Sequence, residues 1–377
     1  MLRVGIVGCG KIADSHASVM QRIQECEIVG VCDSEPLMAR QLWERFPVKR
    51  YFSDLTELLS AARPDVVHIT TPPSSHFDLA KLCLDWGCHV YVEKPFSLTA
   101  GEAQKLIALA QERGLKITAG HDAQFGPAAR RMRTLIRSGF LGAGPVHMES
   151  YYCYELGRAG YATALLGDPK HWVRKLPGKL LQNVISHGIA RIAEMLPGET
   201  AEVLAYGFTS PLLKSLGETE IIDELRVIIC DPGRITAYFT FSSQMRPPLH
   251  EFRIYGAANG LILDPDQDTL LELPGTRFKS YVEKFAPPLL FAKQHLGNVV
   301  ENARAFLKND FHMASGMKCL IESFYRSISE GTQEPIPYRE ILLTARIMDA
   351  IFVQLDAQRP KVGAPEAMSQ QVALPEK

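Results

Sequence analysis

The feature that most constrains this chain is a glycine-rich segment, Gly8-Cys9-Gly10-Lys11-Ile12-Ala13, directly behind the apolar run Leu2–Val7. That run is rich in β-branched residues and does not alternate, which is typical of a buried parallel strand. Gly8 permits a tight turn, Gly10 lets the backbone approach a pyrophosphate, and Ala13 lets the next helix pack closely on the strand. The segment therefore predicts a dinucleotide site at a helix N-terminus, with a purely structural turn as the alternative.

A second expected strand, Glu27–Cys32, ends at Asp33, about where a dinucleotide-binding fold carries an acid for the ribose hydroxyls. A carboxylate there accepts a hydrogen bond from a 2′-hydroxyl and repels a 2′-phosphate, so we expect NAD as the cofactor. Arg40 lies further along and could still reach a 2′-phosphate, which keeps NADP as the less favoured alternative. Asp33 could also cap the helix expected at Pro36–Phe46.

A later apolar run, His89–Val92, leads directly into Glu93-Lys94-Pro95. Parallel sheets bind their ligands at the carboxyl ends of the strands. The position therefore predicts a lysine in an active site, next to the expected cofactor.

The chain has 377 residues, of which 46% are hydrophobic and 22% charged, values typical of globular proteins with room for two cores. Its net charge of -1 argues against a nucleic-acid partner, and the basic cluster at residues 130–133 predicts one solvated or phosphate-facing helix face. No apolar run approaches the ~20 residues of a membrane span, and the N-terminus leaves no room for a signal peptide. We expect a cytoplasmic protein.

Eight cysteines are present, none in a C-x-x-C pair, and several fall inside expected strands or helices. This pattern predicts reduced, buried thiols and no metal site. Cys9, inside the glycine turn, is expected to be the most accessible thiol when no cofactor is bound.

Residues 1–122 alternate short apolar strands with amphipathic helices, which predicts an α/β fold with a doubly wound parallel sheet. Residues 123–358 are expected to form a second α/β domain, with strands joined by short turns in a large, mostly antiparallel sheet. The Pro-, Ala- and Gln-rich tail at 359–377 is expected to be disordered. An open sheet face predicts a homodimer or homotetramer, with apolar positions Val227, Ile229, Tyr238 and Phe239 needing a partner.

In their order along the chain, several motifs resemble those of the glucose-fructose oxidoreductase / inositol dehydrogenase (Gfo/Idh/MocA) family. They are Gly8-x-Gly10-x-x-Ala13, Thr71-Pro72-Pro73-x-x-His76, Glu93-Lys94-Pro95, Phe125-Gly126-Pro127, Gly139-x-x-Gly142, a glycine-led helix bearing His187, and Phe324-Tyr325-x-Ser327-Ile328. The resemblance spans the chain to about residue 355. It implies a Rossmann domain followed by an α/β domain whose open sheet mediates assembly.

The resemblance also implies roles for matching residues. Lys94 would touch the substrate hydroxyl and the nicotinamide ribose, beside Glu93. Thr71, Pro72 and His76 would line the cofactor. His187 would be the proton acceptor.

One position departs from the family, because Asn183 stands where the family usually has an aspartate. Residues 183 and 187 are i and i+4 on one helical face, so both side chains can reach one substrate. An amide cannot act as a base but can orient a hydroxyl. We expect His187 to be the general base with Lys94 assisting; the alternatives are Lys94 as the base, or His187 as an ordinary core histidine.

Substrate contacts are less defined by the sequence. His121 and Asp122 follow the expected strand Lys116–Gly120, where they either face the substrate or fix the domain junction. Aromatic and basic residues also cluster ahead of the helix that carries His187, and would suit a sugar ring beside a phosphate or carboxylate: Tyr154, Arg158, His171, Trp172, Arg174 and Lys179.

Together these features predict an NAD(P)-dependent oxidoreductase that takes a hydride from a secondary hydroxyl of a sugar, uronate, cyclitol or nucleotide-linked sugar. One alternative is transient oxidation by tightly bound NAD, giving elimination, epimerisation or glycoside cleavage. Another is a non-catalytic cofactor- or sugar-binding regulatory protein, since Asn183 departs from the family pattern.

Overall fold

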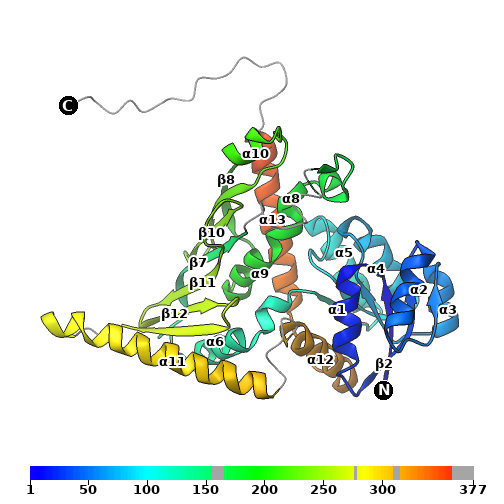
Figure 1. Cartoon of the computed structure of the whole chain (residues 1–377), viewed down its shortest axis with the longest axis horizontal. Coiled ribbons are helices and arrows are strands. Elements are labelled where there is room, and N and C mark those ends of the chain that lie inside the picture. Colours follow the sequence, from blue (N-terminus) through cyan, green and yellow to red (C-terminus); the bar gives the residue numbers. More distant parts are fainter. Residues whose placement is uncertain (155–164, 166, 276–277, 309–314, 359–377) are drawn as a thin grey trace, which may run out of the picture.

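The computed structural model describes residues 1–154, 165, 167–275, 278–308 and 315–358. It has two sheets, each with helices packed against it (Figure 1). The expected tail at 359–377 and Arg158 lie outside the described residues. No helix in the described part of the chain combines the length and apolar character needed to cross a membrane.

The first sheet has six parallel strands in the order β3-β2-β1-β4-β5-β6, so the expected doubly wound parallel sheet is confirmed. The order reverses between β1 and β4, and ligands of such sheets bind at this point, outside the carboxyl ends of the strands. The strands are β1 (Leu2–Val7), β2 (Cys26–Cys32), β3 (Tyr51–Phe52), β4 (Val66–Ile69), β5 (His89–Val92) and β6 (Ile117–Ala119). The helices between them are α1 (Lys11–Met20), α2 (Pro36–Arg45), α3 (Leu55–Ala62), η1 (Pro73–Ser75), α4 (His76–Asp85) and α5 (Ala100–Glu112).

Two of these helices begin where a short polar side chain accepts a backbone N–H of the first turn. Asp54 accepts from Glu57 at 2.9 Å before α3, and Thr99 accepts from Glu102 at 3.2 Å before α5. The expected cap of α2 is wrong: Glu35 occupies the N-cap, and Asp33 is two residues too early.

The second sheet has seven strands in the order β13-β12-β11-β7-β10-β9-β8, antiparallel except for β7 beside β10, which confirms the mostly antiparallel prediction. Its edge strand β13 was not expected from the sequence. The strands are β7 (Pro145–Cys153), β8 (Glu202–Phe208), β9 (Glu224–Cys230), β10 (Thr236–Ser242), β11 (Leu249–Gly256), β12 (Asn259–Asp264) and β13 (Thr269–Pro274). The other helices are η2 (Asp122–Phe125), α6 (Pro127–Arg137), η4 (Trp172–Lys175), α8 (Lys179–Val184), α9 (Ser186–Met195), α10 (Pro211–Ser215), η5 (Ser280–Lys284), α11 (Ala286–Leu307), α12 (Ser315–Glu330) and α13 (Tyr338–Gln358).

The two faces of this sheet differ from the expected assignment. Val227, Ile229 and Phe239 are fully buried in the core shared with α9 and α13, so they do not face a partner. Strand alternation puts their neighbours on the other face, where Tyr238 is exposed as expected. The exposed apolar residues of that face are Leu204, Tyr206, Phe208, Ile228 and Tyr238.

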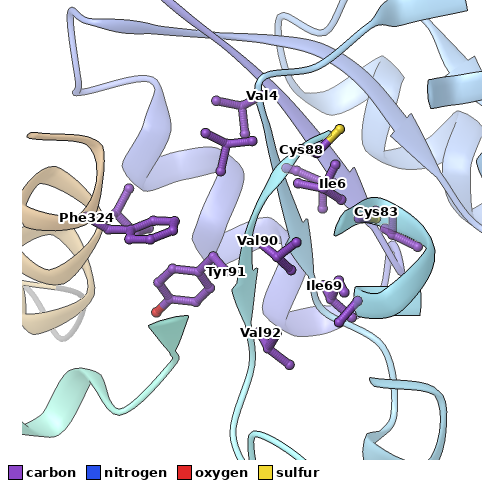
Figure 2. Close-up of a cluster of buried hydrophobic side chains, with 14 of the residues drawn as sticks. Val4, Ile6, Ile69, Cys83, Cys88, Val90, Tyr91, Val92 and Phe324 are labelled. Atoms are coloured by element: carbon purple, nitrogen blue, oxygen red, sulfur yellow. The ribbon is translucent and has the colours of Figure 1, made fainter. Parts of the chain in front are cut away.

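The core of the first sheet includes a helix from late in the chain. Phe324 of α12 points toward Tyr91 of β5, with ring centroids 6.3 Å apart (Figure 2). Other buried members of this core from the same late region are Met317, Leu320, Ile321, Tyr325, Ile336 and Ile341. The chain therefore returns to its first sheet after forming the second one.

Candidate active site

The glycine turn after β1 is shaped as the sequence predicts. Gly8 has φ +89°, and a Cβ atom there would lie 2.6 Å from the side chain of Thr71 and 2.8 Å from its backbone nitrogen. The turn is fixed by the Gly8 N–H, which donates to Cys32 O at 2.8 Å, and by the Thr70 hydroxyl, which donates to Gly8 O at 2.6 Å. At Gly10 a Cβ atom would meet nothing within 4 Å, so the backbone there is open to a ligand.

A cavity of about 610 Å³ lies against this turn, at the switch point of the sheet. Its lining combines the expected residues Gly8, Gly10, Asp33, Thr71 and Pro72 with residues of the surrounding strands, helices and loops: Val7, Cys32, Ser34, Met38, Ser53, Asp54, Leu55, Thr56, Thr70, Ser75, Leu79 and Leu82. Both charged residues in this lining are aspartates. Asp33 accepts the backbone N–H groups of Cys9 at 2.7 Å and Glu35 at 2.9 Å, which fixes its carboxylate at the end of β2.

Several residues expected to contact the cofactor do not line this cavity. Ala13 is completely buried and lets α1 pack on β1, while Lys11 and Ile12 form the first turn of α1 outside the cavity lining. Cys9 is 1% exposed and burial raises its pKa to about 12, so the expectation of an accessible thiol is wrong. Arg40, the candidate for holding a 2′-phosphate, is bound to Glu44 at 2.8 Å.

His76 is also completely buried. Its Nδ1 lies 2.9 Å from the carbonyl oxygen of Pro95, and its Nε2 lies 2.9 Å from that of Thr71. The ring thus joins the loop after β4 to the Glu-Lys-Pro turn, and it positions these two segments from behind the cavity.

Glu93 anchors a buried chain of hydrogen bonds that the sequence did not reveal. Tyr325 OH lies 2.8 Å from His68 Nε2, His68 Nδ1 lies 2.9 Å from His16 Nδ1, and His16 Nε2 lies 2.8 Å from Glu93 Oε1. If Tyr325 donates to His68, His68 to His16 and His16 to Glu93, every contact has one donor and one acceptor with both rings neutral. Burial holds the pKa of His68 well below its ordinary value, in keeping with that assignment.

The row of hydrogen bonds from Tyr325 to Glu93 ends at the backbone of Lys94, whose N–H donates to Glu93 Oε2 at 3.1 Å. Burial alone would raise the pKa of Glu93. The hydrogen bond from His16 and the charge of Lys94 outweigh burial and lower this pKa below its ordinary value. Glu93 therefore fixes the lysine backbone from inside the protein.

Lys94 and Asn183 come together as expected, but the expectation of one helix carrying both Asn183 and His187 is wrong, because a turn at Ile185 separates α8 from α9. Lys94 Nζ donates to the backbone carbonyl of Asn183 at 3.3 Å. Asn183 lies in the last turn of α8, where carbonyls lack helical partners and a cation is favourable. A turn at Ile185 then leads into α9, which carries His187.

A second cavity of about 530 Å³ contains two of the expected residues, Asp122 and His187. Its remaining lining comes from distant parts of the chain: Ala123, Gly126, Pro127, Ala129, Tyr152, Leu263, Pro265, Asp266, Asp268, Ser315 and Gly316. The charge of Lys94 influences the pKa values of Asp122, His187 and buried His121. Lys94 is therefore close to the second cavity, while the adjacent Glu-Lys-Pro turn is tied to the first through His76.

Several buried nitrogen atoms around this cavity have no hydrogen-bond partner in the described part of the chain. They are His121 Nε2, His187 Nδ1, Arg191 Nε and His250 Nε2. The rings of His121 and His187 have centroids 6.1 Å apart. Since buried polar atoms are normally paired, these atoms point to a polar ligand.

Burial sets the protonation of these groups. It lowers the pKa of His187 well below its ordinary value, helped by the nearby positive charge of Lys94, and lowers that of His121 to about 4. These lowered pKa values favour the neutral form of both imidazoles at pH 7. Burial and the neighbouring Glu93 raise the pKa of Asp122 to about 6.

Sequence reasoning missed a second histidine–carboxylate pair. His250 on β11 bonds through Nδ1 to Asp266 Oδ2 at 2.8 Å, and Asp266 lines the second cavity. Tyr152 on β7 lies between the two histidines, with ring centroids 4.6 Å from His250 and 5.8 Å from His187. No short motif joins these residues, because β7, β11 and the turn after β12 are far apart in sequence.

The aromatic and basic cluster expected to bind substrate is dispersed. Tyr154 donates its hydroxyl to Tyr152 at 2.8 Å and is thus one residue removed from the cavity. Arg174 pairs with Glu218, and Lys179 with Glu220, each at 2.6 Å, while Trp172 packs on the second core. Among the described residues these three lie outside the cavity lining, and their contacts order the segment before α8.

The basic cluster on α6 likewise divides. Arg133 bonds to Glu194 and covers the Phe125 ring at 4.5 Å, while Arg131 donates to Asn298 Oδ1 at 3.1 Å. The expected single solvated or phosphate-facing helix face is therefore wrong.

Comparison with known proteins agrees with this architecture. Residues 2–121 match the model of an oxidoreductase family with an NAD-binding Rossmann fold. The chain is 32% identical over 142 residues to D-glucoside 3-dehydrogenase of Escherichia coli, covering 37% of this chain and 40% of that protein. It is 35% identical over 132 residues to UDP-N-acetylglucosamine 3-dehydrogenase of Acidithiobacillus ferrooxidans, covering 35% of this chain and 41% of that protein.

The fold extends beyond these matches. An NAD-binding oxidoreductase of Klebsiella pneumoniae superposes with a TM-score of 0.76 at 19% identity, covering 95% of this chain and 97% of that one. Residues 2–121 therefore match the Gfo/Idh/MocA oxidoreductase family model, in agreement with the motifs, and the chain as a whole shares the fold of the solved structures that it resembles.

Proposed function

We propose that this chain is an NAD-dependent dehydrogenase that oxidises a secondary hydroxyl of a sugar-like polyol. One observation carries the proposal: His187 and Asp122 line the second cavity, the charge of Lys94 acts on both, and the turn that carries Lys94 is tied by His76 to Thr71 in the wall of the dinucleotide-type cavity. The relatives named above are sugar and nucleotide-sugar dehydrogenases by name, which supports this class of substrate.

The first cavity fits a nicotinamide dinucleotide. The open backbone at Gly10 and the free first turn of α1 suit a pyrophosphate, and Asp33 suits ribose hydroxyls. NAD is favoured over NADP because the charged lining residues are Asp33 and Asp54, which repel a 2′-phosphate. When bound, the cofactor would supply the hydride acceptor.

The chain's own residues would then manage the proton and the orientation. His187, neutral at pH 7, accepts the hydroxyl proton, and Lys94 holds the hydroxyl oxygen as negative charge develops on it. Asp122, Tyr152 and the His250–Asp266 pair offer acceptors and donors for the remaining hydroxyls. Asn183 orients the ring beside Lys94.

The test uses the purified full-length chain with NAD⁺, NADP⁺ and a panel of sugars, uronates, cyclitols and nucleotide sugars. We expect NAD⁺ binding by calorimetry and absorbance at the reduced-cofactor band with one substrate class. Tight NAD⁺ binding without reduction across the panel, and with no other product by NMR, would favour a regulatory protein instead.

For assembly, we propose a homo-oligomer formed through the exposed face of the second sheet, with Leu204, Tyr206, Ile228 and Tyr238 at its centre. Tyr238 belongs to the set expected from the sequence, and Leu204, Tyr206 and Ile228 replace its other three members. The cytoplasmic location stays a prediction, and all eight cysteines are free thiols.

A further inference from the structure

Helix α11 lies along the edge of the second sheet (Figure 1). Two of its amide side chains bond to the backbone of the edge strand β13. Gln294 accepts the N–H of Glu272 at 2.7 Å and donates to its carbonyl at 2.9 Å. Asn298 does the same for Leu270, at 3.2 and 3.0 Å.

This pairing works because the two spacings match. Four residues of a helix advance about 6 Å, and two residues of a strand advance about 6.8 Å. The side-chain amides of α11 therefore replace the missing neighbour of β13 and close an edge that would otherwise recruit another strand. Asn302 continues the row by donating to Gln267 O at 2.8 Å.

Because its polar side is fixed against β13, α11 presents an apolar stripe to solvent. Its members follow the alternating four- and three-residue spacing of a two-helix seam: Phe285, Leu289, Ala292, Leu296, Val299, Ala303 and Phe306. The five large side chains are 65–70% exposed. A continuous stripe of this kind marks an interaction surface.

We propose that this stripe, the α11 seam, pairs antiparallel with the α11 seam of a second copy of the chain. The residue sizes are self-complementary in that arrangement. Phe285 lies opposite Ala303, Leu289 opposite Val299, and Ala292 opposite Leu296, so large residues meet smaller ones in each layer.

The available area agrees with a stable pair. Large side chains present on the order of 150–200 Å² each when fully accessible, so five of them at two-thirds exposure give about 600 Å² per copy. Two copies then bury roughly 1,200 Å², the lower limit for specific interfaces. The antiparallel pair has a two-fold axis, and Lys293 of each copy lies beside it. These two positive charges are at the solvated rim, where salt screens their repulsion.

The first experiment is sedimentation velocity on the full chain over a wide concentration range. Leu289→Glu with Leu296→Glu should weaken one association step at least ten-fold, with an unchanged circular dichroism spectrum. The matched control is Leu216→Glu, a 64% exposed leucine after α10, which should leave association unchanged. Tyr206→Glu on the open sheet face separates the two surfaces, because it should not affect the α11 step.

The second experiment fixes the orientation. Chains with Leu289→Cys are mixed with chains carrying Val299→Cys, oxidised gently, and digested for mass spectrometry. Antiparallel pairing predicts a disulfide between residues 289 and 299 of different chains. Four outcomes would each overturn the proposal. The double glutamate variant could associate like the parent, the parent could be monomeric, the seam could bind only lipid vesicles, or the disulfides could form solely between identical positions.

Discussion

The two cavities of this molecule differ in how their buried polar groups are paired. Around the dinucleotide-type cavity, Asp33, Thr70, His76 and Glu93 all have protein partners. Around the second cavity, nitrogen atoms of several buried side chains have none among the described residues. The polar side chains of the first site are thus paired within the protein, so that its open backbone and its shape are what it offers to a ligand, whereas the second site keeps polar atoms unpaired.

The largest effect on turnover should appear when His187, which has an unpaired ring nitrogen at the second cavity, is compared with His76, whose two ring nitrogens are paired near the first cavity. His187→Ala should lower turnover by about 10²- to 10⁴-fold, the usual range for a lost general base, with little loss of stability. His76→Ala should instead destabilise the fold by about 2–4 kcal/mol, because it removes a buried ring with two carbonyl contacts. Turnover per folded molecule and urea unfolding of both variants test this contrast, which fails if the two histidines exchange these behaviours.

Lys94→Ala should reduce turnover on the order of 100-fold, since it removes a positive donor from the reacting oxygen. NAD⁺ affinity should change far less, because Gly8, Gly10 and Asp33 belong to the other cavity. Steady-state kinetics and calorimetry separate the two readouts. Turnover within a few-fold of the parent would remove Lys94 from the site.

Asp122→Asn should make the protein more stable at pH 8 while lowering activity. The pKa of Asp122 is raised to about 6, so its ionised form destabilises the fold above that pH, and an amide mimics the protonated form. The gain should reach up to about 3 kcal/mol at pH 8 and shrink as pH falls through 6. Urea unfolding from pH 5 to 8 measures it; a gain independent of pH would contradict this origin.

The smallest expected effect is that of Asn183→Asp. A carboxylate beside His187 stabilises the imidazolium, so the pKa of His187 should rise and the acid limb of the pH–rate profile should move upward. The change in turnover at pH 8 should stay below about ten-fold. A limb that does not move would place residue 183 too far from the ring.

The first cavity could be predicted because its determinants are local. Gly8, Gly10 and Asp33 act within one strand–turn–helix–strand unit, where spacing along the chain sets spacing in space. The second cavity depends on strand order: Tyr152, His250 and Asp266 meet only because β7 pairs with β11 and β11 with β12. The sequence misassigned Val227 and Phe239 for a similar reason. Helices α9 and α13 cover the face of the second sheet that holds these two residues, and strand alternation alone does not say which face the helices cover.

His187 and Lys94 are intermediate cases. The i, i+4 spacing predicted residues 183 and 187 on one helical face, but α8 ends at Val184 and His187 lies in α9. Only the structure shows that Lys94 binds the backbone carbonyl of Asn183. Arg174 and Lys179 looked like substrate ligands because their partners, Glu218 and Glu220, are some forty residues away.

The return of α12 to the first sheet has a consequence for synthesis on the ribosome. Residues 1–122 emerge first, yet Phe324 and Tyr325, which cover Tyr91 and complete the hydrogen bonds of His68, follow about two hundred residues later. At translation rates of roughly 5–20 residues per second, that is a delay of about 10–40 s. During that interval the nascent first domain carries an uncovered apolar face, the stage at which it is most exposed to chaperones and to aggregation.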